Sequence, residues 1–151
     1  MKLHQLIYFS RNVVAGDDRA LLQHLREIIR ISQRNNQGAG ITGYLIFDKT
    51  WFLQILEGER NKVFATFERI RNDRRHTGVT LTQTRDALAR SFPNWTMGGS
   101  MRTPEKQEIF LRYGIGTQIE PTKLTGGTIL NLALELQEHE QSEKAARREA
   151  S

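Results

Sequence analysis

Two apolar runs separated by three polar residues constrain the fold of this chain more than any other feature of its sequence. The runs occupy residues 41–47 and 51–56, and Asp48-Lys49-Thr50 lies between them. Each run has the length and the aromatic and β-branched content of a buried strand, and a polar break of this length is typical of a hairpin. We therefore predict two paired antiparallel strands here.

The segments around this hairpin complete an alternating pattern of strands and helices. Residues 18–37 carry apolar side chains at helical spacing, with Asp17 or Asp18 as the N-cap, and a second helix is predicted from Asn61 to about Asp73. Further strands are predicted at residues 6–10, 79–84 and 95–101. The order βαββαββ indicates the α+β class and a ferredoxin-like sandwich, in which two helices cover one face of a mixed five-stranded sheet. In this fold the first and third strands are neighbours.

The residues after Met101 are predicted to add two short helices. The first begins at Thr103-Pro104-Glu105, with proline at the first helical position, and the second covers residues 128–137. Helices this short do not form an independent core, so we expect them to pack on the exposed face of the sheet or to form an oligomer contact. The expected organisation is a domain of residues 1–101, a helical extension of 102–139 and a disordered tail of 140–151, which lacks large apolar residues.

Composition excludes several classes of function. The chain has no cysteine, so disulfides, thiolate metal sites and thiol catalysis are excluded, and a reducing cytoplasm is the simplest expected compartment. Its four histidines show no metal-ligand spacing, and no apolar run approaches the roughly 20 residues of a membrane-spanning helix. The formal charge of +5 comes from 22 basic and 17 acidic residues, and the excess is spread thinly. We therefore expect no metal, no membrane and no direct nucleic-acid partner.

A glutamine in the middle of the second apolar run is the most informative single residue. Gln54 interrupts Trp51-Phe52-Leu53-Gln54-Ile55-Leu56. Burying an unpaired amide costs about 1–3 kcal/mol, so a buried Gln54 needs specific partners. If the first and third strands are neighbours, Tyr8 and Gln54 can both point toward the helices and form a pair. Strand alternation alone equally allows Gln54 to face solvent.

Three other groups of residues have both a structural and a functional interpretation. Asn35-Asn36 is typical of a cap that closes the first helix, yet two amides at a helix end can also face a cleft. Asp73-Arg74-Arg75-His76 places cations where they complement a helix dipole. Trp95 and Met97 alternate along the last predicted strand, a pattern typical of core packing.

Four blocks of the sequence resemble, in order and spacing, the signature blocks of one protein family. They are LIYFSRN, NNQGAGITGYLIF, WFLQILEGERNKVFATFERIRNDRRH and RSFPNWTMGG. They are similar to those of BLUF domains, sensors of blue light using flavin adenine dinucleotide, and the resemblance covers residues 3–101. The predicted C-terminal helices also resemble those of short, stand-alone BLUF proteins such as the cyanobacterial PixD type.

The resemblance implies a non-covalently bound flavin, FAD with FMN or riboflavin as alternatives, and a set of residues around it. Tyr8 matches the tyrosine that gives an electron and a proton to the photoexcited flavin, and Gln54 matches the glutamine between that tyrosine and the ring. Asn36 matches an asparagine that hydrogen-bonds the ring, and Asn35 offers a second amide. The other matched positions are Ser10, Trp95 and Met97 of the switch, and Arg69, Asp73, Arg75 and His76 of the second helix and its end.

The resemblance also implies a sensor rather than an enzyme. Because the sequence shows no effector domain, such a sensor is expected to act on a separate protein. By family analogy this partner is a cyclic-di-GMP phosphodiesterase, a response-regulator-like protein or a transcription factor, and a homo-oligomer is expected as well. The matched positions show no departure from the family pattern, although Phe67 stands where some relatives carry tyrosine.

Two other classes of protein share the split βαβ core. An RNA-recognition motif needs exposed stacking aromatics in basic strands, and neither Tyr8-Phe9 nor the LQILEG segment supplies them. An acylphosphatase-like enzyme needs an arginine-bearing phosphate loop, for which Arg11 and Asn12 are insufficient. The photosensor is therefore the preferred hypothesis.

Overall fold

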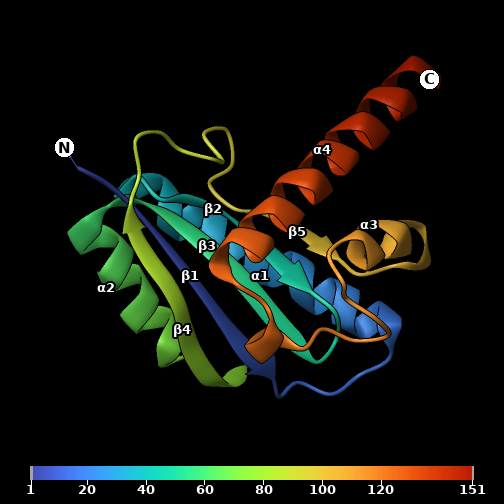
Figure 1. Ribbon diagram of the computed structural model, residues 1–151, viewed down its shortest axis with the longest axis horizontal. Coiled ribbons are helices and arrows are strands. Elements are labelled where there is room, and N and C mark those ends of the chain that lie inside the picture. The colour runs from blue at the N-terminus through green and yellow to red at the C-terminus, as the bar shows by residue number, and fades with distance from the viewer. Residues whose placement is uncertain (1, 151) are drawn as a thin grey trace.

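Five strands form the central sheet of the computed structural model, which describes residues 2–150. They are β1 (Leu3–Asn12), β2 (Thr42–Phe47), β3 (Trp51–Glu59), β4 (His76–Asp86) and β5 (Gly98–Met101). Their order is β4-β1-β3-β2-β5, and only the β2–β5 pair is parallel (Figure 1). The predicted mixed sheet with neighbouring first and third strands is therefore confirmed.

Helix α1 (Asp18–Ala39) covers one face of the sheet, and its two ends have different caps. The Asp17 side chain accepts a hydrogen bond from the amide of Ala20, as predicted for the N-cap. At the other end Gly40, with φ at 67°, occupies the left-handed conformation that glycine adopts without strain. Gly40 is the C-cap, so the interpretation of Asn35-Asn36 as the cap is wrong.

Helix α2 (Arg60–Arg71) lies beside α1 on the same face (Figure 1). Its N-cap is Glu59, the last residue of β3, whose carboxylate accepts the amide proton of Asn61 at 3.3 Å. The prediction of Asn61 as the cap is therefore wrong by two residues, because Glu59 already reaches the free amides of the first turn. The buried side chains under the two helices include Leu6, Tyr8, Leu21, Leu25, Leu45, Leu56, Val63 and Phe67.

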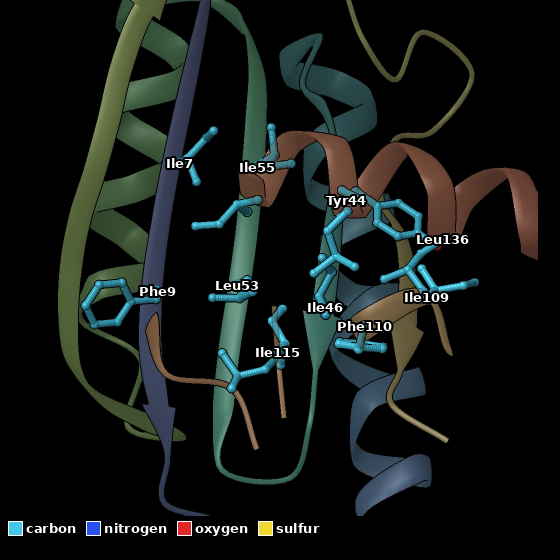
Figure 2. Close-up of a cluster of buried hydrophobic side chains, with 14 of the residues drawn as sticks. Ile7, Phe9, Tyr44, Ile46, Leu53, Ile55, Ile109, Phe110, Ile115 and Leu136 are labelled. Carbon is cyan, nitrogen blue, oxygen red and sulfur yellow. The ribbon is translucent and has the colours of Figure 1, made fainter. Parts of the chain in front are cut away.

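The opposite face of the sheet is covered by the C-terminal third of the chain. Helix α3 (Gln107–Arg112) follows the short helical turn η1 (Pro104–Lys106), and α4 (Gly126–Ala150) follows the turn η2 (Pro121–Lys123). Figure 2 shows how their apolar side chains meet those of the strands. The cluster includes Ile7, Phe9, Tyr44, Ile46, Leu53, Ile55, Ile109, Phe110, Ile129, Leu132 and Leu136. The alternative in which these helices pack on the sheet is thus confirmed.

Helix α4 is much longer than predicted. It continues through residues 140–150, which we expected to be a disordered tail, and its end projects away from the sheet (Figure 1). Glutamate, lysine, alanine and arginine dominate this stretch and favour helix without a hydrophobic partner. Glu143 lies one turn from both His139 and Arg147, and it forms an ion pair with Arg147 at 3.9 Å. Glu140 also anchors the helix through its ion pair with Lys106 of η1.

Strand β5 is shorter than predicted, and Trp95 and Met97 lie in the loop before it. Pro93 is the second residue of a turn in which the amide of Trp95 donates to the carbonyl of Phe92 at 3.3 Å. Pairing with β2 begins only at Gly98, opposite Tyr44. The two residues therefore need not obey strand alternation.

Candidate functional site

Tyr8 and Gln54 face each other across the central pair of strands. They are register partners in β1 and β3, and the Tyr8 hydroxyl donates a hydrogen bond to Oε1 of Gln54. Both side chains are buried, with exposed fractions of 2% and 3%. The interpretation of Gln54 as solvent-facing is therefore wrong. Its Nε2 is directed to the sulfur of Met97 at 3.5 Å, so the amide bridges a phenol and a thioether.

A cleft opens between the sheet and the helices beside this pair. Its volume is about 430 Å³ including the open mouth, within the range of small-molecule sites. Tyr8 and Gln54 form part of its wall together with apolar side chains of α1, β2, β3 and α2. The remaining lining residues are Ile28, Ser32, Leu45, Phe52, Ile70, Asp73, Arg75 and His76.

Burial sets the acidity of Tyr8. It raises the pKa of the phenol well above its ordinary value of about 10, and the Asp73 carboxylate raises it further. Tyr8 is consequently a neutral hydrogen-bond donor at every physiological pH. Only loss of an electron would make the phenol a strong acid in this environment.

Asp73 and Arg75 form an ion pair at the rim of the cleft. The Arg75 guanidinium donates to the carboxylate of Asp73 through Nε at 3.0 Å and Nη2 at 2.6 Å. This hydrogen bonding is the main reason why the pKa of Asp73 lies below its ordinary value and that of Arg75 above. Both residues follow the end of α2 at Arg71, so they do not belong to its last turn. The pair is half-exposed and holds a charged rim in place rather than adding much stability.

His76 connects the cleft to β1. Its Nε2 lies 2.6 Å from the carbonyl of Ile70, which can only accept, so Nε2 carries a proton. In the neutral imidazole Nδ1 is then an acceptor, and the buried Ser10 hydroxyl at 2.8 Å donates to it. The structure thus pairs Ser10 with His76.

Asn36 ties α1 to the segment that carries Trp95 and Met97. Its side chain is buried and donates to the carbonyl of Thr96 at 2.8 Å. Gln33, one turn earlier, donates to the carbonyl of Met97 at 2.9 Å. The structure therefore brings Asn36 to the edge of the candidate site.

Six of the predicted site residues do not line the cleft: Ser10, Asn35, Asn36, Arg69, Trp95 and Met97. The side chains of Asn35 and Arg69 are exposed, and neither belongs to the cleft lining. Arg69 belongs to the last turn of α2, where a cation complements the helix dipole. Sequence reasoning missed Ser32, a polar residue on the apolar stripe of α1 that lines the cleft.

Trp95 and Met97 lie on opposite sides of the sheet. Met97 is fully buried on the α1 side, next to Gln54. Trp95 packs on the α4 side, edge-on to Tyr44 at 6.3 Å between ring centroids and beneath the Lys144 ammonium at 5.4 Å. The indole Nε1 is shielded from solvent and has no hydrogen-bond partner within residues 2–150.

The cleft fits a flat heteroaromatic ligand better than a metal. Ile28, Leu45 and Phe52 offer apolar walls, while the Gln54 amide offers a donor and an acceptor at one edge. Within the described part of the chain, no group of histidine and acidic side chains could hold a metal ion. None of the described helices combines the length and the apolar character needed to cross a bilayer.

Comparison with known proteins agrees with this geometry. The family model described as BLUF, sensors of blue-light using FAD, matches residues 3–98. The photoactivated adenylate cyclase subunit beta of Euglena gracilis is 38% identical over 74 residues, which are 48% of this chain. The matched residues span only 9% of that cyclase subunit, so most of the relative has no counterpart in the match.

Two solved structures extend the comparison to the fold. The structure titled BlsA photo-activated state has a TM-score of 0.74 and 31% sequence identity, covering 87% of this chain and 94% of that one. Klebsiella pneumoniae BlrP1 with FMN and cyclic diGMP has a TM-score of 0.58 and 28% identity, covering 66% of this chain and 26% of that one.

Proposed function

The chain belongs to the BLUF family of blue-light sensors, and from this premise we propose that Tyr8 and Gln54 form its photochemical switch. The single observation that carries the proposal is the buried chain Tyr8–Gln54–Met97 at the wall of the cleft. The thioether of Met97 is a weak acceptor for the Gln54 NH₂, so this amide keeps hydrogen-bonding capacity for a ligand in the cleft. The ligand proposed is FAD, and FMN or riboflavin also fits a site whose walls contact mainly the ring.

A bound flavin supplies absorption of blue light and an excited state that is a strong oxidant. Tyr8 is the residue proposed to give up the electron and, because its hydroxyl already points at Oε1 of Gln54, the proton follows that hydrogen bond. Gln54 has a carbonyl at one end of its amide and an NH₂ at the other. Rotation or tautomerisation of Gln54 therefore reverses the hydrogen bonds offered to Tyr8 and to the cleft, with no lasting chemical change.

We further propose that the segment from Trp95 to Met97 passes this reversal to the helices after Thr103. Gln54 contacts the Met97 sulfur directly, and Trp95 contacts Lys144 of α4. Met97→Ala is expected to weaken light-dependent partner binding while leaving flavin binding intact. If Met97→Ala changed neither the spectral response nor partner binding, this route would be wrong.

The light signal is proposed to act on a separate partner protein. One relative is named an adenylate cyclase subunit, and one similar structure contains cyclic diGMP. A phosphodiesterase acting on cyclic diGMP is therefore the first candidate, with a response-regulator-like protein or a transcription factor as the others. A homo-oligomer and a cytoplasmic location also remain predictions.

An absorption spectrum before and after blue light tests the proposed function. Purified protein reconstituted with FAD is expected to show a flavin spectrum that shifts slightly to the red and recovers in the dark. Tyr8→Phe and Gln54→Leu are expected to bind flavin but to lose the shift. Tyr113→Phe is the matched control, because this tyrosine lies on the opposite side of the sheet with its hydroxyl near Asn131. Protein that binds no flavin, or a Gln54→Leu variant that still shifts, would refute the proposal.

A further inference from the structure

A histidine of α1 lies beyond the outer end of the cleft and has no assigned role. His24 stands one helical turn before Ile28, and Ile28 stands one turn before Ser32; the last two line the cleft. Residues four apart share a helix face, so His24 continues the same stripe outward. At about 1.5 Å of rise per residue, His24 lies roughly 12 Å along the helix from Ser32.

The imidazole of His24 is shielded yet unsatisfied. Its Nε2 is covered from solvent and has no hydrogen-bond partner among residues 2–150. A buried polar nitrogen without a partner costs free energy, so such atoms call for an explanation. A missing ligand group is one explanation that the position of His24 suits, because His24 lies one helical turn from Ile28 of the cleft lining.

The charged neighbours of His24 belong to the rim of the same cleft. Burial and the Arg75 guanidinium hold the pKa of His24 below its ordinary value, while Glu27 and Asp73 act in the opposite direction. The imidazole is therefore neutral near pH 7 and can donate one N–H. Asp73 engages Nε and Nη2 of Arg75, which leaves the N–H groups of Nη1 as further donors.

We infer that His24, together with Arg75, binds the 5′-phosphate of a flavin nucleotide. The inference rests on the proposed flavin site: His24 would hold the phosphate of a flavin whose ring lies beside Gln54 and whose ribityl chain follows the stripe of Ser32 and Ile28. A neutral N–H donor and a guanidinium suit a phosphate dianion and gain little from an uncharged hydroxyl. His24 is thus a specificity residue that favours FMN and FAD over riboflavin.

Titration of the apoprotein with riboflavin and with FMN, followed by flavin fluorescence, tests this inference. The wild-type chain is expected to bind FMN roughly ten-fold more tightly than riboflavin, the size of one hydrogen bond to a charged group. His24→Leu is expected to remove most of that preference while changing riboflavin affinity less than about two-fold. His24→Gln, which keeps an N–H donor, is expected to restore part of it.

Riboflavin binding also reports whether each variant is folded. Gln23→Leu, a change at the exposed neighbouring position, is the matched control and is expected to keep the wild-type preference. Equal loss of affinity for both flavins in His24→Leu would show a structural role and overturn the phosphate contact, as would an unchanged preference. A wild-type chain that binds neither flavin would instead refute the proposed function itself.

Discussion

The two faces of the sheet are built from alternate residues of the same strands but hold different kinds of side chain. β1 directs Ile7 and Phe9 toward α3 and α4, and it directs Tyr8 and Ser10 toward α1 and α2. Both faces bury an apolar cluster, and both contain buried hydrogen bonds, such as that from Gln5 to Glu57 on the α3/α4 face. The α1/α2 face differs because its buried polar pair, Tyr8 and Gln54, lies in the wall of an open cleft.

Replacement of Phe110 should lower the free energy of unfolding more than any other change proposed below. It tests how far the cluster on the α3/α4 face stabilises the fold. Phe110 is fully buried in the α3/α4 cluster (Figure 2). Phe110→Ala is expected to lower the free energy of unfolding by about 3–5 kcal/mol, measured by urea denaturation. The adjacent Leu111 is 55% exposed, so Leu111→Ala should change the free energy of unfolding by less than about 0.5 kcal/mol.

The light-induced spectral shift of Phe110→Ala tests whether the two faces of the sheet act independently. In conditions where this variant is folded, its light-induced shift should match that of the wild type, because Phe110 contacts neither Tyr8 nor the cleft. An altered shift would mean that the two faces are not separable.

A double-mutant cycle on Tyr8 and Gln54 should show a smaller change in the free energy of unfolding. This change measures the coupling between the two side chains. Tyr8→Phe or Gln54→Leu alone leaves a buried polar partner unpaired, at a cost of about 1–3 kcal/mol. The double variant removes both groups, so its loss of stability should fall short of the sum by about 1–2 kcal/mol. Urea denaturation of the apoproteins measures the cycle, and Tyr113→Phe with Gln54→Leu should be additive. Additivity for Tyr8 and Gln54 would contradict the pairing.

The smallest expected change in the free energy of unfolding comes from replacing Asp73 at the rim of the cleft, and it depends on pH. Arg75 lowers the pKa of Asp73 in the folded protein, so the carboxylate contributes stability above its ordinary pKa of about 3.9. This contribution is lost as the pH falls through the lowered folded-state pKa. Asp73→Asn should therefore be slightly less stable than the wild type near neutral pH, with the difference vanishing in acid. Urea denaturation between acid and neutral pH measures this difference, with Glu138→Gln as an exposed control. A difference that grew in acid would contradict the prediction.

The sequence predicted the sheet and the central pair well because both depend on local patterns. The runs around Asp48-Lys49-Thr50 are strands, and the neighbouring first and third strands bring Tyr8 to Gln54. One polar residue in an apolar run singled out Gln54, and the resemblance to BLUF domains supplied its proposed role in a switch. Burial of Gln54 itself needed the structure, since alternation does not say which face is covered.

The start of β5 and the end of α4 were predicted wrongly in part because they depend on contacts distant in sequence. Trp95 and Met97 looked like strand residues, but the turn at Phe92 and the register with Tyr44 begin β5 only at Gly98. Helix α4 continues past Leu136 because Glu140 finds Lys106, a residue 34 positions earlier. Neither contact leaves a periodic signal in the sequence.

The anchored position of Glu140 gives the end of α4 the properties of a lever arm. The Lys106 ammonium and the Ser100 hydroxyl hold Glu140 against the sheet, and the following residues extend beyond it. From Glu140 to Glu149 the helix is about 14 Å long, so a tilt of roughly 20° about this fulcrum moves the tip by about 5 Å. A side-chain rearrangement at Trp95 that tilts α4 in this way would move the end of the helix far enough to change its contacts with another molecule.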